Sequence, residues 1–141
     1  MRTLVLERHV PADPTSVFAA WTDVEQLVRW WWPMLPDTDY VVDARVGGFY
    51  RMASKSAGFG VHGQFVEVKP PHRLVMTWCW EDGDERGPIE TVAVDFTPEP
   101  AGTAVAGTTV TVSHPCEDSD NLEQGWTDVL DRLVAFADHL G

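Results

Sequence analysis

Residues 122–140 read LEQGWTDVLDRLVAFADHL, and this stretch predicts one long amphipathic helix. At about 100° per residue, its apolar side chains fall within roughly 80° of Trp126, on a single face. Asp120, with Glu123 three residues later, matches a capping box that begins such a helix. A helix about 30 Å long needs an apolar partner of similar size. The predicted apolar face comprises Leu122, Trp126, Val129, Leu130, Leu133, Val134, Phe136, Ala137 and Leu140.

The preceding hundred residues predict a sheet that supplies this partner. Thr3 to Val10 alternates apolar and polar residues as a strand does. Turn residues separate the later segments, among them an acidic stretch at 81–87 that we interpret as a solvated hairpin loop. Connections this short favour an antiparallel meander. The further strands are expected at 40–45, 48–54, 60–69, 73–80, 89–97 and 103–113.

Two short helices are expected after the first strand. Asp13 suits an N-cap and Pro14 the first helical position, and helical spacing continues to Thr22. Asp23 then caps a second helix, which ends before Pro33. A sheet of seven strands that packs on one helix has to curl around it. The sequence thus predicts an α+β fold with a curved antiparallel sheet around the C-terminal helix and a space between them.

Composition and charge predict a single domain over residues 1–141 that acts on neither nucleic acid nor membranes. The chain is 44% hydrophobic, enough for one core, and a signal peptide or membrane span is not evident, so a cytoplasmic location is expected. Its net charge of −12 would repel phosphates and anionic membrane surfaces. Cys79, Cys116 and the five histidines lack metal-binding spacings, so we expect no metal and no other cofactor.

Two common functional motifs are not supported by the sequence. Residues 58–63 match G-x-G-x-x-G, but they lead into a predicted strand, whereas a dinucleotide site needs a helix N-terminus at that point. A G-x-S-x-G nucleophile elbow is absent from the sequence.

Side-chain alternation selects the residues expected to line the space inside the sheet. Met76, Trp78 and Trp80 share one face of their strand with Leu74. Aromatic rows are more often core than ligand site, but convergent polar groups in such a row are typical of pockets. We assign Arg51, His62 and, as a further candidate, Glu90 to this role. The predicted ligand-binding residues are Phe49, Arg51, His62, Met76, Trp78, Trp80, Val94, Trp126, Val129, Leu130 and Leu133.

Several short motifs, taken in the order in which they occur along the chain, resemble the activator-of-heat-shock-ATPase homologue family of the START, or SRPBCC, superfamily. The resemblance implies a helix-grip fold with a hydrophobic cavity. Superfamily members bind lipids, sterols or aromatic polyketides, a minority catalyse cyclisation or dehydration, and the eponymous member stimulates a chaperone ATPase. Fold alone therefore does not assign an activity. The motifs are Trp21-Thr22-Asp23, residues 46–51 (VGGFYR), residues 63–68 (GQFVEV), Pro70-Pro71, Thr77-Trp78-x-Trp80 and Gly125-Trp126.

The leading hypothesis is binding of a small hydrophobic or aromatic molecule between helix and sheet, with Arg51 and His62 setting its orientation. An enzyme of the cyclase or dehydratase type is the alternative, with His62 as general acid or base and Arg51 stabilising an enolate-like charge.

A third hypothesis is protein interaction, either with a partner in the manner of a co-chaperone or as a homodimer. It requires an exposed cluster, and the competing interpretation is that the same side chains cover one end of the sheet. The residues in question are Trp30, Trp31, Trp32, Met34 and Leu35.

Overall fold

The computed structural model describes residues 2–99, 107–116 and 119–138, which form a seven-stranded antiparallel sheet and three helices. The strand order is β1-β7-β6-β5-β4-β3-β2, so β2 to β7 form a meander and β1 pairs with β7. The predicted helix-grip fold is confirmed. In chain order the elements are β1 (Arg2–Val10), α1 (Pro14–Thr22), α2 (Val24–Trp30), β2 (Thr38–Val42), β3 (Phe49–Ser54), β4 (Phe59–Lys69), β5 (Arg73–Asp82), β6 (Glu85–Pro98), β7 (Thr108–Cys116) and α3 (Ser119–Ala137).

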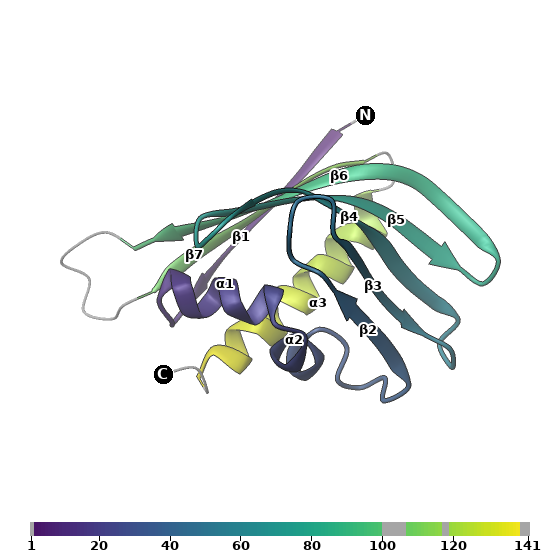
Figure 1. The fold of residues 1–141 in the computed structure, drawn as a ribbon, viewed down its shortest axis with the longest axis horizontal. Helices are drawn as coiled ribbons and strands as arrows, with labels where there is room; N and C mark the ends of the chain where they lie inside the picture. Colours follow the sequence, from purple (N-terminus) through teal and green to yellow (C-terminus); the bar gives the residue numbers. More distant parts are fainter. Residues whose placement is uncertain (1, 100–106, 117–118, 139–141) are drawn as a thin grey trace.

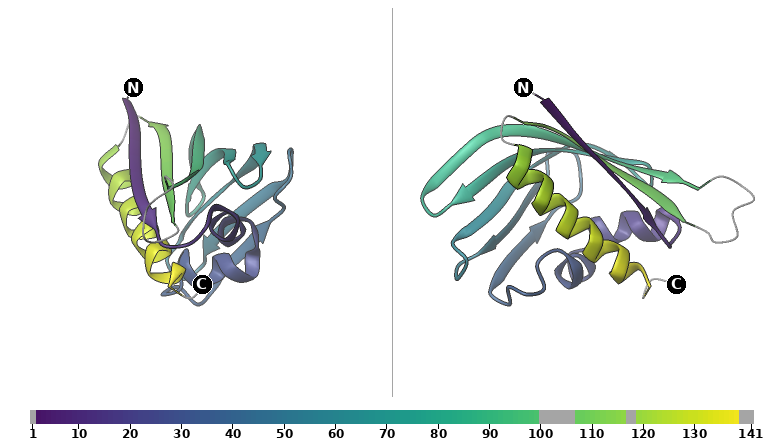
Figure 2. Two further views of the ribbon diagram at one scale, coloured as in Figure 1. Left: turned by 90° about the vertical axis from the view of Figure 1, so that its left-hand side faces the viewer. Right: turned by 180° about the vertical axis from the view of Figure 1, so that it is seen from behind.

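The sheet curves around α3, and all three helices lie on its concave side (Figures 1 and 2). The short helices α1 and α2 lie beside the second half of α3. On the inner face of α3, Trp126, Val129, Leu130 and Leu133 are buried, as the amphipathic pattern predicts. Among the described residues, no helix combines the length and apolarity that a bilayer crossing requires.

Two predicted boundaries need correction at the ends of α3 and β2. Because α3 begins at Ser119, Asp120 lies inside the helix, and the predicted N-cap at Asp120 is wrong. Leu140 falls outside the described residues. Strand β2 ends at Val42, three residues before the predicted end at 45.

The acidic stretch at 81–87 is mostly strand, so the predicted loop is wrong. Strand β5 continues to Asp82 and β6 begins at Glu85, which leaves a turn of Gly83 and Asp84. Gly83 has φ +58°, a conformation that glycine adopts without steric cost. The ladder between β6 and β7 covers Ala93 to Pro98, while β6 continues beside β5 as far as the turn. We refer to residues 85–92 of β6 as the β6 arm.

Arg132 of α3 fixes the C-terminal end of α2. Its Nε lies 3.1 Å from the Trp30 carbonyl oxygen and 3.0 Å from that of Trp31, and its Nη2 donates to the Trp31 oxygen at 2.7 Å. The last carbonyl groups of a helix have no partner within it, and a cation there also complements the helix dipole. The guanidinium thus holds a helix of only seven residues against α3.

Replacing Arg132 by Met should lower the free energy of unfolding by about 1–3 kcal/mol, because three hydrogen bonds to charged nitrogen are lost and the carbonyl groups stay partly buried. Urea denaturation measures this change. The control is Arg29→Met, an exposed residue in the last turn of the same helix, for which we expect a change within about 0.5 kcal/mol. Equal effects of the two substitutions would contradict the assigned role.

Candidate functional site

All seven tryptophans of the chain pack in one connected cluster on the concave side of the sheet. Trp31, which follows α2, contacts five of the others, including Trp126 of α3 at a ring distance of 5.7 Å and Trp78 of β5 at 6.4 Å. Trp78 and Trp126 lie 5.1 Å apart. The rings meet mostly edge to face or tilted, as aromatic quadrupoles favour.

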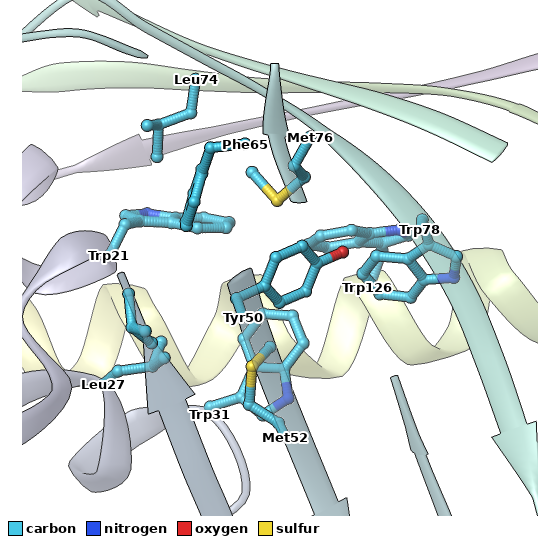
Figure 3. Close-up of a pocket in the computed structure, with 11 residues that line it drawn as sticks. Trp21, Leu27, Trp31, Tyr50, Met52, Phe65, Leu74, Met76, Trp78 and Trp126 are labelled. Carbon is cyan, nitrogen blue, oxygen red and sulfur yellow. The ribbon is translucent and has the colours of Figure 1, made fainter. Parts of the chain in front are cut away.

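This cluster fills the deep interior. Figure 3 shows the side chains of Trp21, Trp31, Phe65, Met76 and Trp126 pointing toward one another around a small cavity. The cavity has a volume of about 20 Å³, room for about one water molecule, and an apolar lining of this kind stays dry. Beside the middle of α3, the molecule therefore has a solid core.

A larger pocket opens between the first half of α3 and the β6 arm. Its volume is about 670 Å³, within the range of about 300–1,000 Å³ found for small-molecule sites. Six aromatic rings line it, and Glu90 and Asn121 are its polar side chains. The lining residues are Trp31, Trp32, Phe59, Trp78, Trp80, Gly87, Pro88, Glu90, Asn121, Leu122, Gly125, Trp126 and Val129.

Eight of the predicted site residues, all of them apolar, fall into three groups. Four of them, Trp78, Trp80, Trp126 and Val129, line the large pocket. Met76 lines the small interior cavity. The remaining three, Val94, Leu130 and Leu133, are fully buried core residues and line neither space.

The three other predicted residues, Phe49, Arg51 and His62, lie on the outer face of the sheet, so their expected place in the interior is wrong. In β3, Tyr50 and Met52 belong to the hydrophobic core, and they have the opposite parity to Phe49 and Arg51. Simple alternation along β4 predicts that His62 shares a face with Val66 and Val68.

A bulge explains the error at His62. The β4–β5 register shifts between Phe65 and Glu67, so Val68 packs toward the core while His62 faces outward. A bulge changes which face each later residue of the strand occupies.

On the outer face, Arg51 and His62 form an ion-pair cluster with Glu81. The Arg51 guanidinium bonds both Glu81 carboxylate oxygens at 2.9 Å, and His62 Nδ1 lies 2.8 Å from Oε2. Hydrogen bonds from Arg51 lower the pKa of Glu81 to about 2, against the cost of burial. This cluster joins β3, β4 and β5 and is separate from the pocket.

Inside the pocket, Glu90 is held by His114, which is not among the predicted site residues. His114 of β7 is completely buried, and its Nε2 lies 2.8 Å from Glu90 Oε1. Trp126 Nε1 donates to His114 Nδ1 at 3.1 Å. Because Nδ1 accepts this bond, the proton of a neutral ring is on Nε2, which donates to Glu90. The alternation of Val110, Val112 and His114 indicates that His114 faces the interior, but the predicted strand ends at 113.

Two further polar groups belong to the pocket walls. The indole nitrogens of Trp31 and Trp78 are buried and have no hydrogen-bond partner in the part of the chain that the structure describes. A buried unpaired donor costs about 1–3 kcal/mol. Both nitrogens are closed off from the pocket as well as from solvent, so they identify no group of a ligand.

The proposed docking cluster is largely buried, which favours the competing interpretation that these aromatics cover one end of the sheet. Trp30, Trp31 and Trp32 are at most 9% exposed, and Leu35 packs against the core. Met34 is 55% exposed.

Neither a metal site nor a dinucleotide loop is present in the described ranges. Three or more His, Cys, Asp or Glu side chains do not gather there in a way that would hold a metal ion. In the G-x-G-x-x-G match, Gly58 takes a positive φ in a turn, and a side chain at Gly63 would collide with the Thr77 carbonyl. The glycines therefore serve the β3–β4 turn and close strand packing.

A sequence profile described as Activator of Hsp90 ATPase homolog 1-like protein matches residues 11–138. Among solved structures, an uncharacterized protein from Rhizobium leguminosarum is 28% identical, with a TM-score of 0.78, and the match covers 98% of this chain and 95% of that chain. A search of curated proteins finds no match.

Two other solved structures have related folds. A protein of the dynemicin biosynthetic locus is 25% identical with a TM-score of 0.76, and the match covers 96% of this chain but 47% of that longer chain. An HSP90 activator from Plasmodium falciparum is 22% identical with a TM-score of 0.71, over 96% of this chain and 95% of that one, and shows the fold alone.

The buried histidine predicts a dependence of stability on pH. Burial lowers the pKa of His114 below its ordinary 6.5, against the opposing bond to Glu90. As the pH falls through about 6.5, the unfolded chain binds a proton at this residue that the folded chain does not, so stability falls. Between about pH 7.5 and pH 5.5, we expect wild type to lose about 1 kcal/mol more unfolding free energy than His114→Gln.

Urea denaturation at the two pH values measures this difference, with exposed His72→Gln as the control that keeps the wild-type dependence. A decline in His114→Gln as steep as in wild type would contradict the prediction.

Proposed function

The chain belongs to the family of activator of Hsp90 ATPase homolog 1-like proteins, and we propose that it binds a small aromatic or hydrophobic molecule in the pocket between α3 and the β6 arm. The observation that carries this proposal is the pocket of about 670 Å³ with six aromatic rings in its walls. A solid core beneath it keeps those walls in place, so little ordering is needed when a ligand binds.

The chemistry of the walls favours a flat, apolar ligand. Phe59 and Trp80 are stacked at 5.4 Å, and Trp32 meets both rings edge-on at 5.2 and 6.2 Å. Apolar burial contributes about 25 cal/mol per Å², and stacking adds to this.

One comparison also supports a small-molecule role. A protein of the dynemicin biosynthetic locus shares 25% identity across 96% of this chain, and a place in a biosynthetic locus is consistent with such a role.

An enzyme of the cyclase or dehydratase type is a second candidate, favoured by one observation. Glu90 lines the pocket and is positioned by His114, an arrangement suited to a carboxylate general base. His62 and Arg51, the residues first considered for this chemistry, lie on the opposite face of the sheet.

Gly125 offers a way to test where the ligand binds. It lines the pocket, and a Cβ added there would meet no atom within 4 Å. Gly125→Phe should therefore fill part of the pocket without disturbing the core, and weaken binding of pyrene-1-methanol by at least about tenfold in isothermal titration calorimetry.

Two controls accompany this substitution. Gly125→Ala should keep the binding and stabilise the helix by about 0.5–1 kcal/mol. His62→Ala, on the outer face, should leave the dissociation constant unchanged. Unaltered binding in Gly125→Phe would place the ligand elsewhere.

A further inference from the structure

We infer that the ligand of this pocket carries a hydrogen-bond donor, a hydroxyl or a protonated amine, on an apolar ring system, and that Glu90 selects it. The inference rests on the proposed function and adds the chemical class of the ligand. The same feature disfavours acidic ligands, such as fatty acids.

The position of Glu90 is the first part of the argument. Its side chain lines the pocket and is 16% exposed, so it is accessible from the pocket but mostly shielded from bulk water. His114 Nε2 donates a hydrogen bond to Glu90 Oε1 at 2.8 Å, while Glu90 Oε2 has no hydrogen bond to the described residues. An ionised carboxylate oxygen accepts hydrogen bonds and donates none. Glu90 is therefore oriented by one oxygen and free to accept a donor at the other.

The charge of the pocket is the second part. Trp126 donates to His114 Nδ1, so the ring is neutral and does not cancel the charge of Glu90. Burial, which lowers the pKa of His114, keeps it so. Arg and Lys are absent from the pocket lining along the described part of the chain. The pocket thus holds one uncompensated negative charge, in a chain whose net charge is −12.

A second carboxylate–histidine pair, on the outer face of the sheet, differs from the Glu90–His114 pair in having a cation beside it. There Glu81 also meets a histidine, but Arg51 neutralises it with two hydrogen bonds of 2.9 Å. No such cation is present among the described residues that line the pocket, so a ligand donor has to supply the positive end of the interaction. Charge-assisted hydrogen bonds are about twice as strong as neutral ones.

The aromatic walls accommodate both kinds of donor. A hydroxyl group donates to Glu90 while its ring lies against Trp80 and Trp126. A protonated amine gains a salt bridge to Glu90 and a cation–π interaction with the same indoles. A carboxylate would face Glu90 at close range and be repelled.

The test uses four molecules of one shape, measured by isothermal titration calorimetry near neutral pH: pyrene-1-methanol, 1-pyrenemethylamine, 1-methylpyrene and 1-pyrenecarboxylate. With wild type, we expect the alcohol and the amine to bind more tightly than 1-methylpyrene, and at least about tenfold more tightly than the carboxylate. Which of the two donors binds more tightly distinguishes the hydroxyl source from the amine source.

Glu90→Gln is the matched variant, because the amide oxygen still accepts from His114 while the charge is gone. In this variant, the preference for the amine over the carboxylate should fall by at least about tenfold. The control Glu123→Gln removes one charge from an exposed position of α3 outside the pocket, and it should keep the wild-type order. If Glu90 only supports His114, its substitution changes stability and leaves the order of the four ligands intact.

The outcomes separate this inference from the proposed function. If none of the four molecules binds wild type, the proposed function fails and the inference with it. If all four bind wild type with similar affinity, or the carboxylate binds most tightly, the inference is overturned while the binding function stands. The wild-type ranking decides this even if Glu90→Gln does not fold.

Discussion

The contact between Trp31 and Trp126, with ring centroids 5.7 Å apart, joins the segment after α2 to the long helix, and the rest of the interior is arranged around it. Trp78 of β5 packs against both rings, so helix, sheet and connecting segment meet at one point. Rings of this size leave a cavity of about 20 Å³ between them. The space expected between sheet and helix is therefore displaced toward the β6 arm, where the pocket opens.

Two carboxylate–histidine pairs on opposite faces of the sheet show how environment decides the role of similar residues. Glu81 bonds to both His62 and Arg51, which makes their cluster an ion pair that joins strands. Glu90 and His114 have Trp126 as their third member, which adds a hydrogen bond but no charge. The outer group is compensated and structural, while the inner one leaves its carboxylate able to act on a ligand.

Local signals predicted much of this fold, and long-range packing accounts for most of the errors. The bounds of α1 follow from Asp13 and Pro14, since capping is decided within a few residues. Alternation placed Trp78 and Trp80 toward the interior, but it misplaced His62, because the bulge near Phe65 depends on the pairing with β5. No sequence pattern distinguishes a solid aromatic core from a pocket, since that depends on how the rings of separate elements interlock.

The β6 arm has a kinetic consequence. Its residues form a ladder with β5 but not with β7, whose ladder with β6 covers only Ala93 to Pro98. Along the described chain, this wall of the pocket therefore has a neighbouring strand on one side only. Ribbons with such sparse support bend at lower free energy than a packed core opens. We expect a ligand of the proposed kind to exchange with solvent when the β5–β6 hairpin bends. Its residence time then depends on the stiffness of this hairpin, while the tryptophan cluster stays packed.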